Sequence, residues 1–272
     1  MSSKKNVLIT GATKGIGLRT TRALIEMGFD VFATGRNEAK LKEMENGKWK
    51  MKNGTSPSTS GRGLNFLARN ELRNSGEGRI SGYYVGDLTV GDNYAELYQR
   101  AKDALGSVDI LINNAGEYVY SPIEETKKAD IERLIKLNFE VPYLLSQLAV
   151  ADMKNNNWGR IINIGSISGA VGEANATLYS ATKAALTGLT KALALEVATH
   201  NITVNIINPG WVNTELTQNA LDSEESETLE MIPQKRFIEP QEVADLALYL
   251  ISDKAKGLTG QYINLCAGLS LG

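Results

Sequence analysis

Residues 6–17 read Asn6-Val7-Leu8-Ile9-Thr10-Gly11-Ala12-Thr13-Lys14-Gly15-Ile16-Gly17, and a helical pattern continues from Ile16 to Met27. The first half is a β-branched apolar run, which is typical of a buried strand. The glycines that follow allow a tight turn and a close approach of the backbone to a pyrophosphate, and a helix N-terminus adds unpaired N–H groups and the positive end of its dipole. The same glycines would also serve a tight turn that holds no ligand. This stretch therefore predicts a strand–turn–helix unit and a candidate phosphate site.

Short strand-like runs alternate with helical patterns along the rest of the chain, including long helical patterns from Asp130 to Lys154 and from Leu178 to Thr199. This alternation predicts a single α/β domain over residues 1–272, a doubly wound parallel sheet of about seven strands with helices on both faces. Ligands of such sheets bind beyond the carboxyl ends of the strands. The predicted strands are Asn6 to Thr10, Asp30 to Thr34, Ser81 to Val85, Asp109 to Asn113, Arg160 to Ile164, Thr203 to Asn208 and Gln261 to Leu265.

Residues 46–69 interrupt this alternation. They include Asn53-Gly54-Thr55-Ser56-Pro57-Ser58-Thr59-Ser60-Gly61-Arg62-Gly63, which has too few apolar side chains to pack as a helix or strand. Without this segment, Leu41, Met44 and Leu72 would fall at positions i, i+3 and i+7 of one helix. We interpret residues 46–69 as an insertion, with a flexible surface loop favoured over an added contact surface or an artefact of the gene sequence.

The composition excludes several kinds of partner and compartment. The apolar content of 42% suffices for a sizeable core, and a formal net charge of −2 provides no basic field for nucleic acid or an anionic membrane. Cys266 is the only cysteine, and no Cys/His/carboxylate cluster has metal-ligand spacing, so neither an intrachain disulfide nor a metal site is expected. No apolar run reaches the roughly 20 residues of a membrane span, and Met1 to Lys5 leave no room for a signal peptide. We expect a soluble, cytoplasmic protein.

The end of the second predicted strand bears on the choice of cofactor. Its sequence, Ala33-Thr34-Gly35-Arg36, lacks the acidic residue that would hold the ribose 2′-hydroxyl of NAD. Arg36 and Lys14 instead provide two cations, and arginine binds phosphate through two parallel hydrogen bonds. The alternative is a pair of exposed surface cations without a ligand. We predict NADPH/NADP+ rather than NADH as the cofactor.

The stretch Leu178-Tyr179-Ser180-Ala181-Thr182-Lys183 sets a tyrosine and a lysine four residues apart, with Ser166 thirteen residues before the tyrosine. On a helix this spacing puts the phenol and the ammonium on one face, where the ammonium is expected to lower the tyrosine pKa from about 10. Tyr98 and Lys102 repeat the spacing without an upstream serine, so we interpret that pair as a solvated helix face. Tyr179, Lys183 and Ser166 are therefore candidate catalytic residues.

Further motifs follow the other predicted strands in order. With them, the chain resembles the short-chain dehydrogenase/reductase family from Val7 to nearly the C-terminus, interrupted only by residues 46–69. The resemblance implies a Rossmann-like fold. Besides the glycine-rich turn and the Ser166, Tyr179 and Lys183 set, the motifs are Asp87-Leu88, Asn113-Asn114-Ala115-Gly116, Asn138 and Pro209-Gly210-Trp211-Val212-Asn213-Thr214.

The resemblance implies roles for these residues in binding the cofactor. Asp87 and Leu88 would meet the adenine, Asn114 to Gly116 would line the cofactor cleft, and Val212 and Thr214 would hold the carboxamide and the pyrophosphate. Read singly, each motif could also be a helix cap, a strand-end hydrogen bonder or a turn. The expected cofactor-binding residues are Gly11, Thr13, Lys14, Gly15, Ile16, Gly17, Arg36, Asp87, Leu88, Asn114, Ala115, Gly116, Tyr179, Lys183, Pro209, Gly210, Val212 and Thr214.

The resemblance also implies a reaction between the nicotinamide and a carbonyl group. Tyr179 would donate its proton to the oxygen as hydride reaches the carbon, and Lys183 would lower the pKa of the phenol while binding the nicotinamide ribose. Ser166 would fix the carbonyl oxygen, and Asn138 would support a water that links Lys183 to solvent. We expect an NADPH-dependent oxidoreductase that interconverts a carbonyl and a secondary alcohol of a small metabolite.

Two other functions share part of this pattern. A non-catalytic NADP-binding sensor would be expected to have lost Tyr179 or Lys183, and this chain keeps both. A sugar-nucleotide epimerase or dehydratase also uses the Tyr-x-x-x-Lys spacing, but those relatives space their glycines differently and lack this form of Pro209-Gly210. We rank both below the reductase.

The sequence does not identify the substrate. We expect pocket walls from Ile167 to Ala176 and from Glu117 to Tyr120, and a lid from Thr214 to Met231. The C-terminal stretch Asn264-Leu265-Cys266-Ala267-Gly268-Leu269 is similar to ketoreductases of secondary metabolism and to fatty-acyl ones alike. The resemblance further implies a homodimer or homotetramer built on the two long helices.

Overall fold

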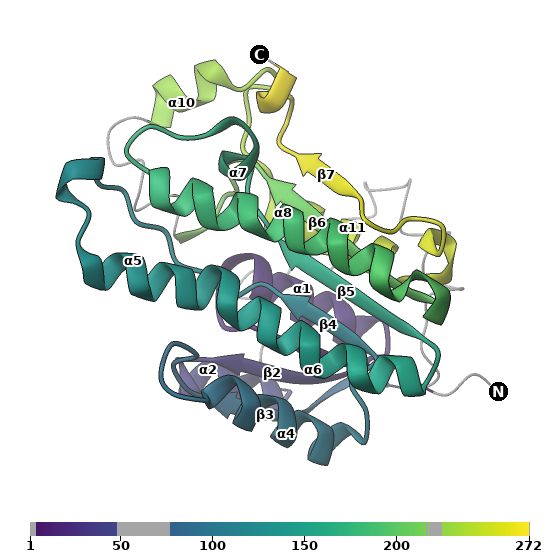
Figure 1. Cartoon of the computed structure of the whole chain (residues 1–272). Coiled ribbons are helices and arrows are strands. Elements are labelled where there is room, and N and C mark those ends of the chain that lie inside the picture. Colours follow the sequence, from purple (N-terminus) through teal and green to yellow (C-terminus); the bar gives the residue numbers. More distant parts are fainter. Residues whose placement is uncertain (1–3, 48–76, 216, 218–224, 272) are drawn as a thin grey trace.

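The computed structural model of the chain describes residues 4–47, 77–215, 217 and 225–271 (Figure 1). Seven strands form one sheet in the order β3-β2-β1-β4-β5-β6-β7, and every neighbouring pair is parallel. The predicted α/β fold with a seven-stranded parallel sheet is confirmed. The strands are β1 (Asn6–Ile9), β2 (Asp30–Gly35), β3 (Arg79–Val85), β4 (Ile110–Asn113), β5 (Gly159–Ile164), β6 (Ile202–Pro209) and β7 (Tyr262–Leu265).

The central strands are buried on both faces, which explains why their sequences are continuous apolar runs rather than alternating ones. Every residue of β4, β5 and β6 is buried. The strand order reverses direction between β1 and β4, which pair in the register Leu8↔Leu111. The carboxyl ends of these two strands therefore form the topological switch point, where sheets of this kind bind ligands.

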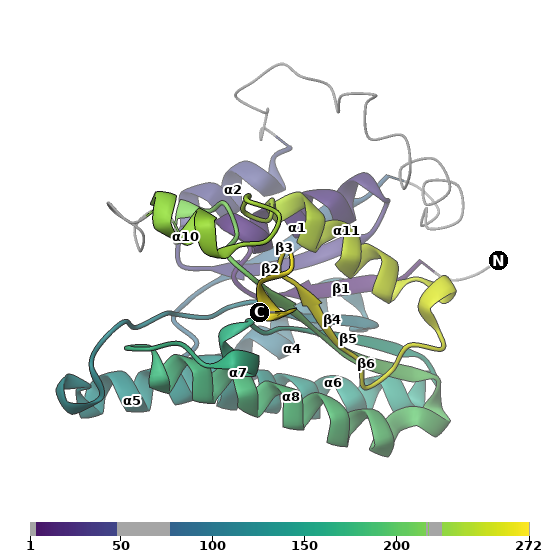
Figure 2. The same ribbon diagram turned by 90° about the horizontal axis from the view of Figure 1, so that it is seen from above.

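Helices cover both faces of the sheet, which is the middle one of three layers (Figure 2). Leu24 and Val243 belong to a buried cluster on one face, and Leu97 and Leu145 belong to a second cluster on the other. The first face is covered by α1 (Gly15–Glu26), α2 (Glu38–Glu45) and α11 (Pro240–Ile251), and the second by α4 (Asn93–Leu105), α6 (Val141–Asn155) and α8 (Thr177–Val197). The shorter elements are η1 (Ile123–Glu125), α5 (Lys128–Ile135), η2 (Lys136–Glu140), α7 (Ser168–Val171), η3 (Ala198–His200), α10 (Glu225–Met231), η4 (Asp253–Ala255) and η5 (Leu269–Leu271).

Capping residues set where several helices begin. Asn37 accepts a hydrogen bond from the backbone N–H of Lys40 at 3.0 Å and starts α2. Glu239 and Glu242 form a capping box at the start of α11, with Pro240 in its first turn. Within the described residues, none of these helices is long and apolar enough to cross a membrane.

The helix expected over Asp130 to Lys154 is not regular. The chain runs as α5, then the π-helical turn η2, then α6. Asn138 lies in this wide turn and is fully buried, and its side-chain amide binds the backbone of Glu117 instead of facing solvent. The predicted helical segment is therefore present, with one wider π-helical turn at the position where Asn138 contacts a distant loop.

The second tyrosine–lysine pair does not form a solvated face. Tyr98 is 4% exposed, and its hydroxyl donates to Asp152 Oδ2 at 2.6 Å. Lys102 Nζ donates to the other oxygen of Asp152 at 3.0 Å. The prediction is wrong for Tyr98 because Asp152, on α6, satisfies the hydroxyl and allows the ring to join the core. Burial, together with this hydrogen bond, raises the pKa of Tyr98.

The predicted insertion at 46–69 lies outside the described residues from residue 48 onwards, as does Leu72. In the described part, Leu41 and Met44 are both buried and α2 ends at Glu45. The proposed continuation of this helix after the insertion stays a prediction.

Candidate active site

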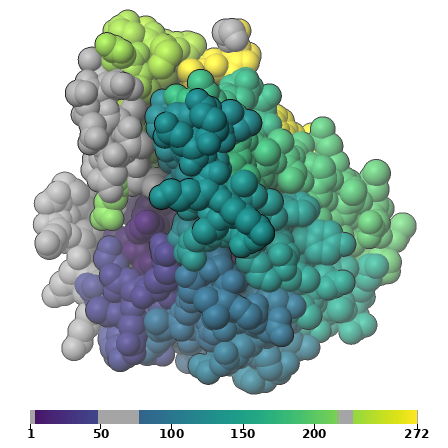
Figure 3. Space-filling model, turned by 60° about the vertical axis from the view of Figure 1, so that its left-hand side comes forward, coloured from purple at the N-terminus to yellow at the C-terminus, as the bar shows by residue number. Residues whose placement is uncertain are grey.

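A cleft of about 520 Å³ opens at the carboxyl ends of the strands around the switch point. Figure 3 views the molecule from this side, with α4 low in the picture and α10 at the top. Of the predicted cofactor-binding residues, Gly11, Thr13, Lys14, Arg36, Asp87, Leu88, Ala115 and Gly116 line the cleft. The other lining residues are Thr34, Gly35, Asn37, Glu38, Lys40, Gly86, Glu117, Arg133, Leu137 and Glu215.

The glycine-rich turn is built by close contacts with the end of β4. Thr10 Oγ1 accepts the backbone N–H groups of Asn114 and Ala115 at 3.0 and 2.9 Å. The Asn114 amide donates to the carbonyls of Thr10 and Gly11 at 2.9 and 3.1 Å. A Cβ at Gly17 would lie 2.1 Å from the Gly11 carbonyl oxygen, so only glycine allows α1 to start this close to the turn. Asn114 thus serves the turn with its side chain rather than lining the cleft.

Six other predicted cofactor residues do not line the cleft. A Cβ at Gly15 would approach Thr214 to 3.2 Å, so Thr214 packs against the start of α1. The Pro209 carbonyl accepts the Ile167 N–H at 2.9 Å, and Val212 is buried and bridges to Ile238. The remaining two pack inward, Ile16 against the core and Gly210 against Cys266.

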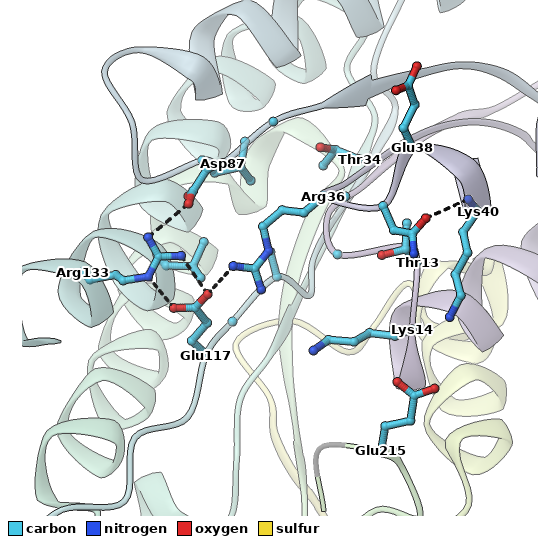
Figure 4. Close-up of a pocket in the computed structure, with 18 residues that line it drawn as sticks. Thr13, Lys14, Thr34, Arg36, Glu38, Lys40, Asp87, Glu117, Arg133 and Glu215 are labelled. Atoms are coloured by element: carbon cyan, nitrogen blue, oxygen red, sulfur yellow. Dashed lines mark hydrogen bonds and ion pairs between the residues drawn. The ribbon is translucent and has the colours of Figure 1, made fainter. Parts of the chain in front are cut away.

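Glu117 lies at the centre of a charge cluster with Arg36, Arg133 and Asp87 (Figure 4). Arg133 donates from Nε and Nη2 to the two Glu117 oxygens at 2.7 and 2.8 Å, and from Nη1 to Asp87 at 3.1 Å. Arg36, from the end of β2, approaches Glu117 from the opposite side and donates from Nη1 at 2.8 Å. Lys14 points into the same space beside Arg36. The predicted phosphate-binding arginine is therefore ion-paired within the protein.

Arg133 holds both carboxylates of the charge cluster in their ionised form. The hydrogen bond from Arg133 lowers the pKa of Glu117 and outweighs the effect of burial. Burial raises the pKa of Asp87, but hydrogen bonds from Thr89 and Arg133 outweigh it and leave the pKa below its usual value. The sequence analysis did not predict Arg133 as a site residue, because it belongs to no motif and lies within a helical pattern. The only signal was Glu117, which directly follows the Asn113 to Gly116 motif.

The three catalytic side chains predicted from spacing meet where β5 ends and α8 begins. Lys183 Nζ donates to the Ile164 carbonyl at 2.9 Å and lies 5.7 Å from the centroid of the Tyr179 ring. Ser166 is buried and accepts the backbone N–H of Ser168 at 3.1 Å. A Cβ at Gly116 would lie 3.4 Å from Lys183 Nζ, so the catalytic group borders the cofactor cleft.

The acid–base properties of this group differ from the expectation. Burial raises the pKa of Tyr179 to about 12, an effect opposed by the hydrogen bond with Ser166 and increased by Glu173. Burial also lowers the pKa of Lys183 to about 8. The expectation that Lys183 lowers the phenol pKa is not met in the protein alone, because burial dominates and the ammonium donates to Ile164 rather than to the phenol.

Asn138 joins the cofactor side of the site to the catalytic side. Its Oδ1 accepts the Glu117 N–H at 3.0 Å, and its Nδ2 donates to the Glu117 carbonyl at 2.9 Å and to Thr182 Oγ1 at 3.2 Å. The structure thus brings all four predicted catalytic residues to one end of the sheet. The side-chain amide of Asn138 is committed to these contacts, and its support of a water stays a prediction.

A second polar cluster, formed by Glu173, Tyr118 and Ser168, lies on the other side of Tyr179. Tyr118 Oη and Ser168 Oγ each donate to a different oxygen of Glu173 at 2.6 Å. The Tyr118 ring meets the Tyr179 ring edge-on, with centroids 4.9 Å apart. Burial and the hydrogen bond to Glu173 raise the pKa of Tyr118. These residues fall within the predicted pocket walls, although no sequence pattern connects them.

Two other expectations concern residues around the site. The predicted lid over Thr214 to Met231 is described only at residues 214, 215 and 217 and in α10. Within residues 4–47, 77–215, 217 and 225–271, no group of three or more His, Cys, Asp or Glu side chains is arranged to hold a metal ion.

Two family models match the sequence of this chain. The model described as "Enoyl-(Acyl carrier protein) reductase" matches residues 67–270. The model described as "short chain dehydrogenase" matches residues 5–57. Together they account for both the glycine-rich turn and the Ser166, Tyr179 and Lys183 set.

Similar proteins match over nearly their whole lengths. An uncharacterized oxidoreductase, YxjF, of Bacillus subtilis is 34% identical, with 97% of this chain and 98% of the relative covered. D-beta-hydroxybutyrate dehydrogenase of Cupriavidus necator is 30% identical, with 98% of each chain covered. The crystal structure of a putative short-chain alcohol dehydrogenase from Sinorhizobium meliloti superimposes with a TM-score of 0.82 at 30% identity, covering 100% of this chain and 98% of the other.

Proposed function

Because this chain belongs to the short-chain dehydrogenase/reductase family, we propose that it is an NADPH-dependent reductase of ketones, or the reverse alcohol dehydrogenase, acting on a small metabolite. One observation carries this function: Tyr179, Lys183 and Ser166 meet directly beside the glycine-lined cleft, with Gly116 between the cleft and Lys183. A proton donor therefore lies next to a site built for a dinucleotide.

The residues of the cleft fit such a cofactor. Gly11, at a φ of +69°, and Gly17 leave the backbone open at the start of α1, where N–H groups and the helix dipole favour a pyrophosphate. Lys14 and Arg36 line the same cleft where β2 ends, and they support the choice of NADPH because the 2′-phosphate adds negative charge there. Arg36 contacts Glu117 through Nη1 alone, so its other N–H donors stay available for the phosphate.

When bound, a nicotinamide cofactor would provide the hydride that the carbonyl carbon needs. Tyr179 holds the proton that the oxygen needs to become a hydroxyl, and a pKa of about 12 keeps the phenol protonated at neutral pH. Ser166 would position the carbonyl oxygen, while Lys183 would bind the ribose and favour loss of the phenolic proton as its ammonium approaches. Asn138 would position the loop from Gly116 to Glu117 against this group.

The relatives support a keto group or a secondary alcohol as the reacting centre. Besides the hydroxybutyrate dehydrogenase, a 3-oxoacyl-(acyl-carrier-protein) reductase FabG of Buchnera aphidicola is 32% identical over 98% of this chain and 97% of the relative. On the basis of this similarity we propose a role like that of a ketoreductase, in secondary or fatty-acid-like metabolism. We also expect a cytoplasmic homodimer or homotetramer.

A panel of ketones and aldehydes with NADPH and with NADH, followed by absorbance at the reduced nicotinamide band, tests the function. Oxidation of NADPH that depends on a ketone supports it. Tight NADPH binding with no turnover on any ketone, aldehyde or alcohol of the panel would favour a sensor instead.

An Arg36→Asp change tests the choice of cofactor. We expect the ratio of kcat/KM for NADPH over NADH to fall by about 10²-fold or more, because a phosphate-binding cation is replaced by an anion. Lys256→Asp makes the same charge change at an exposed residue just after η4 and should leave the ratio unchanged. An unchanged ratio in Arg36→Asp would contradict the assignment of this arginine.

A further inference from the structure

We propose that Glu173 determines which substrates enter: next to the reacting carbonyl, the pocket accepts a hydrogen-bond donor such as a hydroxyl group and rejects a carboxylate. This inference rests on the proposed function, because it concerns the substituent beside the carbonyl that Tyr179 and Ser166 would hold. It assigns a substrate class, hydroxylated ketones without an acidic group near the carbonyl.

Glu173 lies one side chain away from each of the two groups that would hold the carbonyl. On one side, Ser168 Oγ is 2.6 Å from Glu173 Oε2 and 3.2 Å from Ser166 Oγ. On the other side, Tyr118 Oη is 2.6 Å from Glu173 Oε1, and its ring meets the Tyr179 ring edge-on. The five side chains are therefore linked by direct contacts, which place the carboxylate beside the position proposed for the carbonyl.

The backbone holds this wall in place. Gly172, just before Glu173, has a φ of +79°, and Asn175 has a φ of +59°, so two residues of the segment have positive φ angles. The Glu173 carbonyl accepts the Ala176 N–H at 3.1 Å. Asn175 is tied to the facing loop by its carbonyl, which accepts the Ser121 N–H at 2.6 Å, and by its amide, which donates to Tyr120 Oη at 3.0 Å. These contacts fix the backbone that carries the Glu173 carboxylate.

The surroundings of the Glu173 carboxylate differ from those of Glu117, which is ion-paired with two arginines. Both oxygens of Glu173 accept hydrogen bonds from neutral hydroxyls, and no ion pair joins Glu173 to another described residue. Its charge acts on the catalytic phenol, since Glu173 contributes to the raised pKa of Tyr179.

Glu173 can favour some substrates over others because its carboxylate accepts hydrogen bonds and repels anions. An ionised carboxylate has about four acceptor positions and no donor, so positions remain for a hydroxyl of the substrate after Tyr118 and Ser168 have bound. A substrate carboxylate has no proton to donate and is repelled. Like charges within about 6 Å in a partly buried site disfavour each other by about tenfold or more in binding.

Two ketones of equal chain length isolate the effect. In 4-hydroxybutan-2-one a hydroxymethyl group replaces the carboxylate of acetoacetate, and the methyl ketone is the same. We expect the wild-type protein to reduce the hydroxyketone with a kcat/KM at least tenfold above that of acetoacetate. Glu173→Gln removes the charge at nearly constant size, and it should reduce this ratio about tenfold, chiefly by lowering the KM for acetoacetate.

Two matched variants separate charge from structure. Tyr118→Phe removes one hydrogen bond to Glu173 but keeps its charge, so the ratio should persist even where both rates fall. Asp103→Asn removes one negative charge from an exposed position on α4 and should change neither the rates nor the ratio. A ratio lost equally in Tyr118→Phe and Glu173→Gln would show that the cluster acts only as a scaffold, which overturns the proposal.

Binding provides a measurement that needs no turnover. The Tyr179→Phe protein with NADPH should bind the hydroxyketone at least tenfold more tightly than acetoacetate by calorimetry. Equal dissociation constants, or equal kcat/KM values in the wild type, would overturn the assignment of Glu173. Absence of turnover with this binding preference intact would instead contradict the proposed reductase function alone.

Discussion

Tyr179 and Tyr98 have the same neighbour, a lysine four residues later, and nearly opposite surroundings. Tyr98 donates to Asp152 and joins two helices, whereas Tyr179 lies between Ser166, Tyr118 and Lys183 at the edge of a cleft. Spacing alone cannot separate the two tyrosines, because the difference comes from the side chains that the fold brings to each phenol. At the scale of the residue, the two tyrosines therefore provide a matched experiment.

Tyr179→Phe should lower kcat about 10²- to 10⁴-fold, because the proton donor is lost while the ring is kept. NADPH binding, followed by its fluorescence, should stay within a few-fold of the wild type. Tyr98→Phe should leave kcat unchanged and lower the free energy of unfolding by about 1 kcal/mol through the lost hydrogen bond. Retention of most turnover by Tyr179→Phe would remove this tyrosine from the mechanism.

The pH dependence of reduction should reflect Lys183 rather than Tyr179. Reduction needs a protonated phenol and a charged lysine, and the phenol stays protonated up to a pKa of about 12. The lysine loses its proton near its lowered pKa of about 8, so kcat/KM should be highest below pH 8 and fall as pH rises through that value. A profile that stays flat to pH 10 would contradict this. In Lys183→Arg, any remaining activity should lack the decline near pH 8, because a guanidinium stays charged.

Among the helices, strands and turns, those that depend on local sequence patterns could be predicted. Features that depend on contacts between residues far apart in the sequence could not. The seven strands could be predicted because buried parallel strands are apolar runs, and the glycine turn because its residues are contiguous. The π-helical turn η2 could not, since Lys136–Glu140 continues a helical pattern and the bond of Asn138 to Glu117 joins residues that no spacing rule relates. The charge cluster was missed for the same reason: Glu117 meets Arg133 and Arg36 from different elements, and no spacing rule relates them.

Gly17→Ala tests how closely α1 packs on the turn that precedes it. The added Cβ would lie 2.1 Å from the Gly11 carbonyl oxygen and 2.4 Å from the Asn114 amide nitrogen. We expect a loss of about 1–3 kcal/mol in the free energy of unfolding and at least a tenfold weaker NADPH affinity, because the turn must shift. Gly257→Ala, where nothing lies within 4 Å of the new Cβ, is the control and should leave Tm and affinity unchanged. An unaltered Gly17→Ala protein would show that the contact relaxes at no cost.

At the scale of the whole molecule, one helical layer exposes large apolar side chains. Ile135 on α5, Tyr143 on α6 and Leu195 on α8 are 42%, 48% and 83% exposed. These are the helices on which the sequence resemblance places the contact between subunits. Exposed apolar side chains gathered on one layer support such a contact.

A Tyr143→Glu, Leu195→Glu double variant should dissociate the proposed dimer or tetramer, because two charges would be buried in an apolar contact. Light scattering should show a lower mass than for the wild type. Val90→Glu, at a 59% exposed position outside this layer, should keep the wild-type mass. A wild-type protein that is monomeric at all concentrations would contradict the assembly.

The charge cluster also affects how an anionic ligand would arrive. Arg36 and Arg133 contribute two positive charges, and Asp87 and Glu117 contribute two negative ones, so the cluster as a whole is neutral. A phosphate that binds Arg36 would then share the guanidinium with Glu117 instead of neutralising a bare cation. The neutral cluster would therefore contribute little to the dependence of affinity on ionic strength. That dependence would come from Lys14, which lies beside Arg36 and outside the cluster.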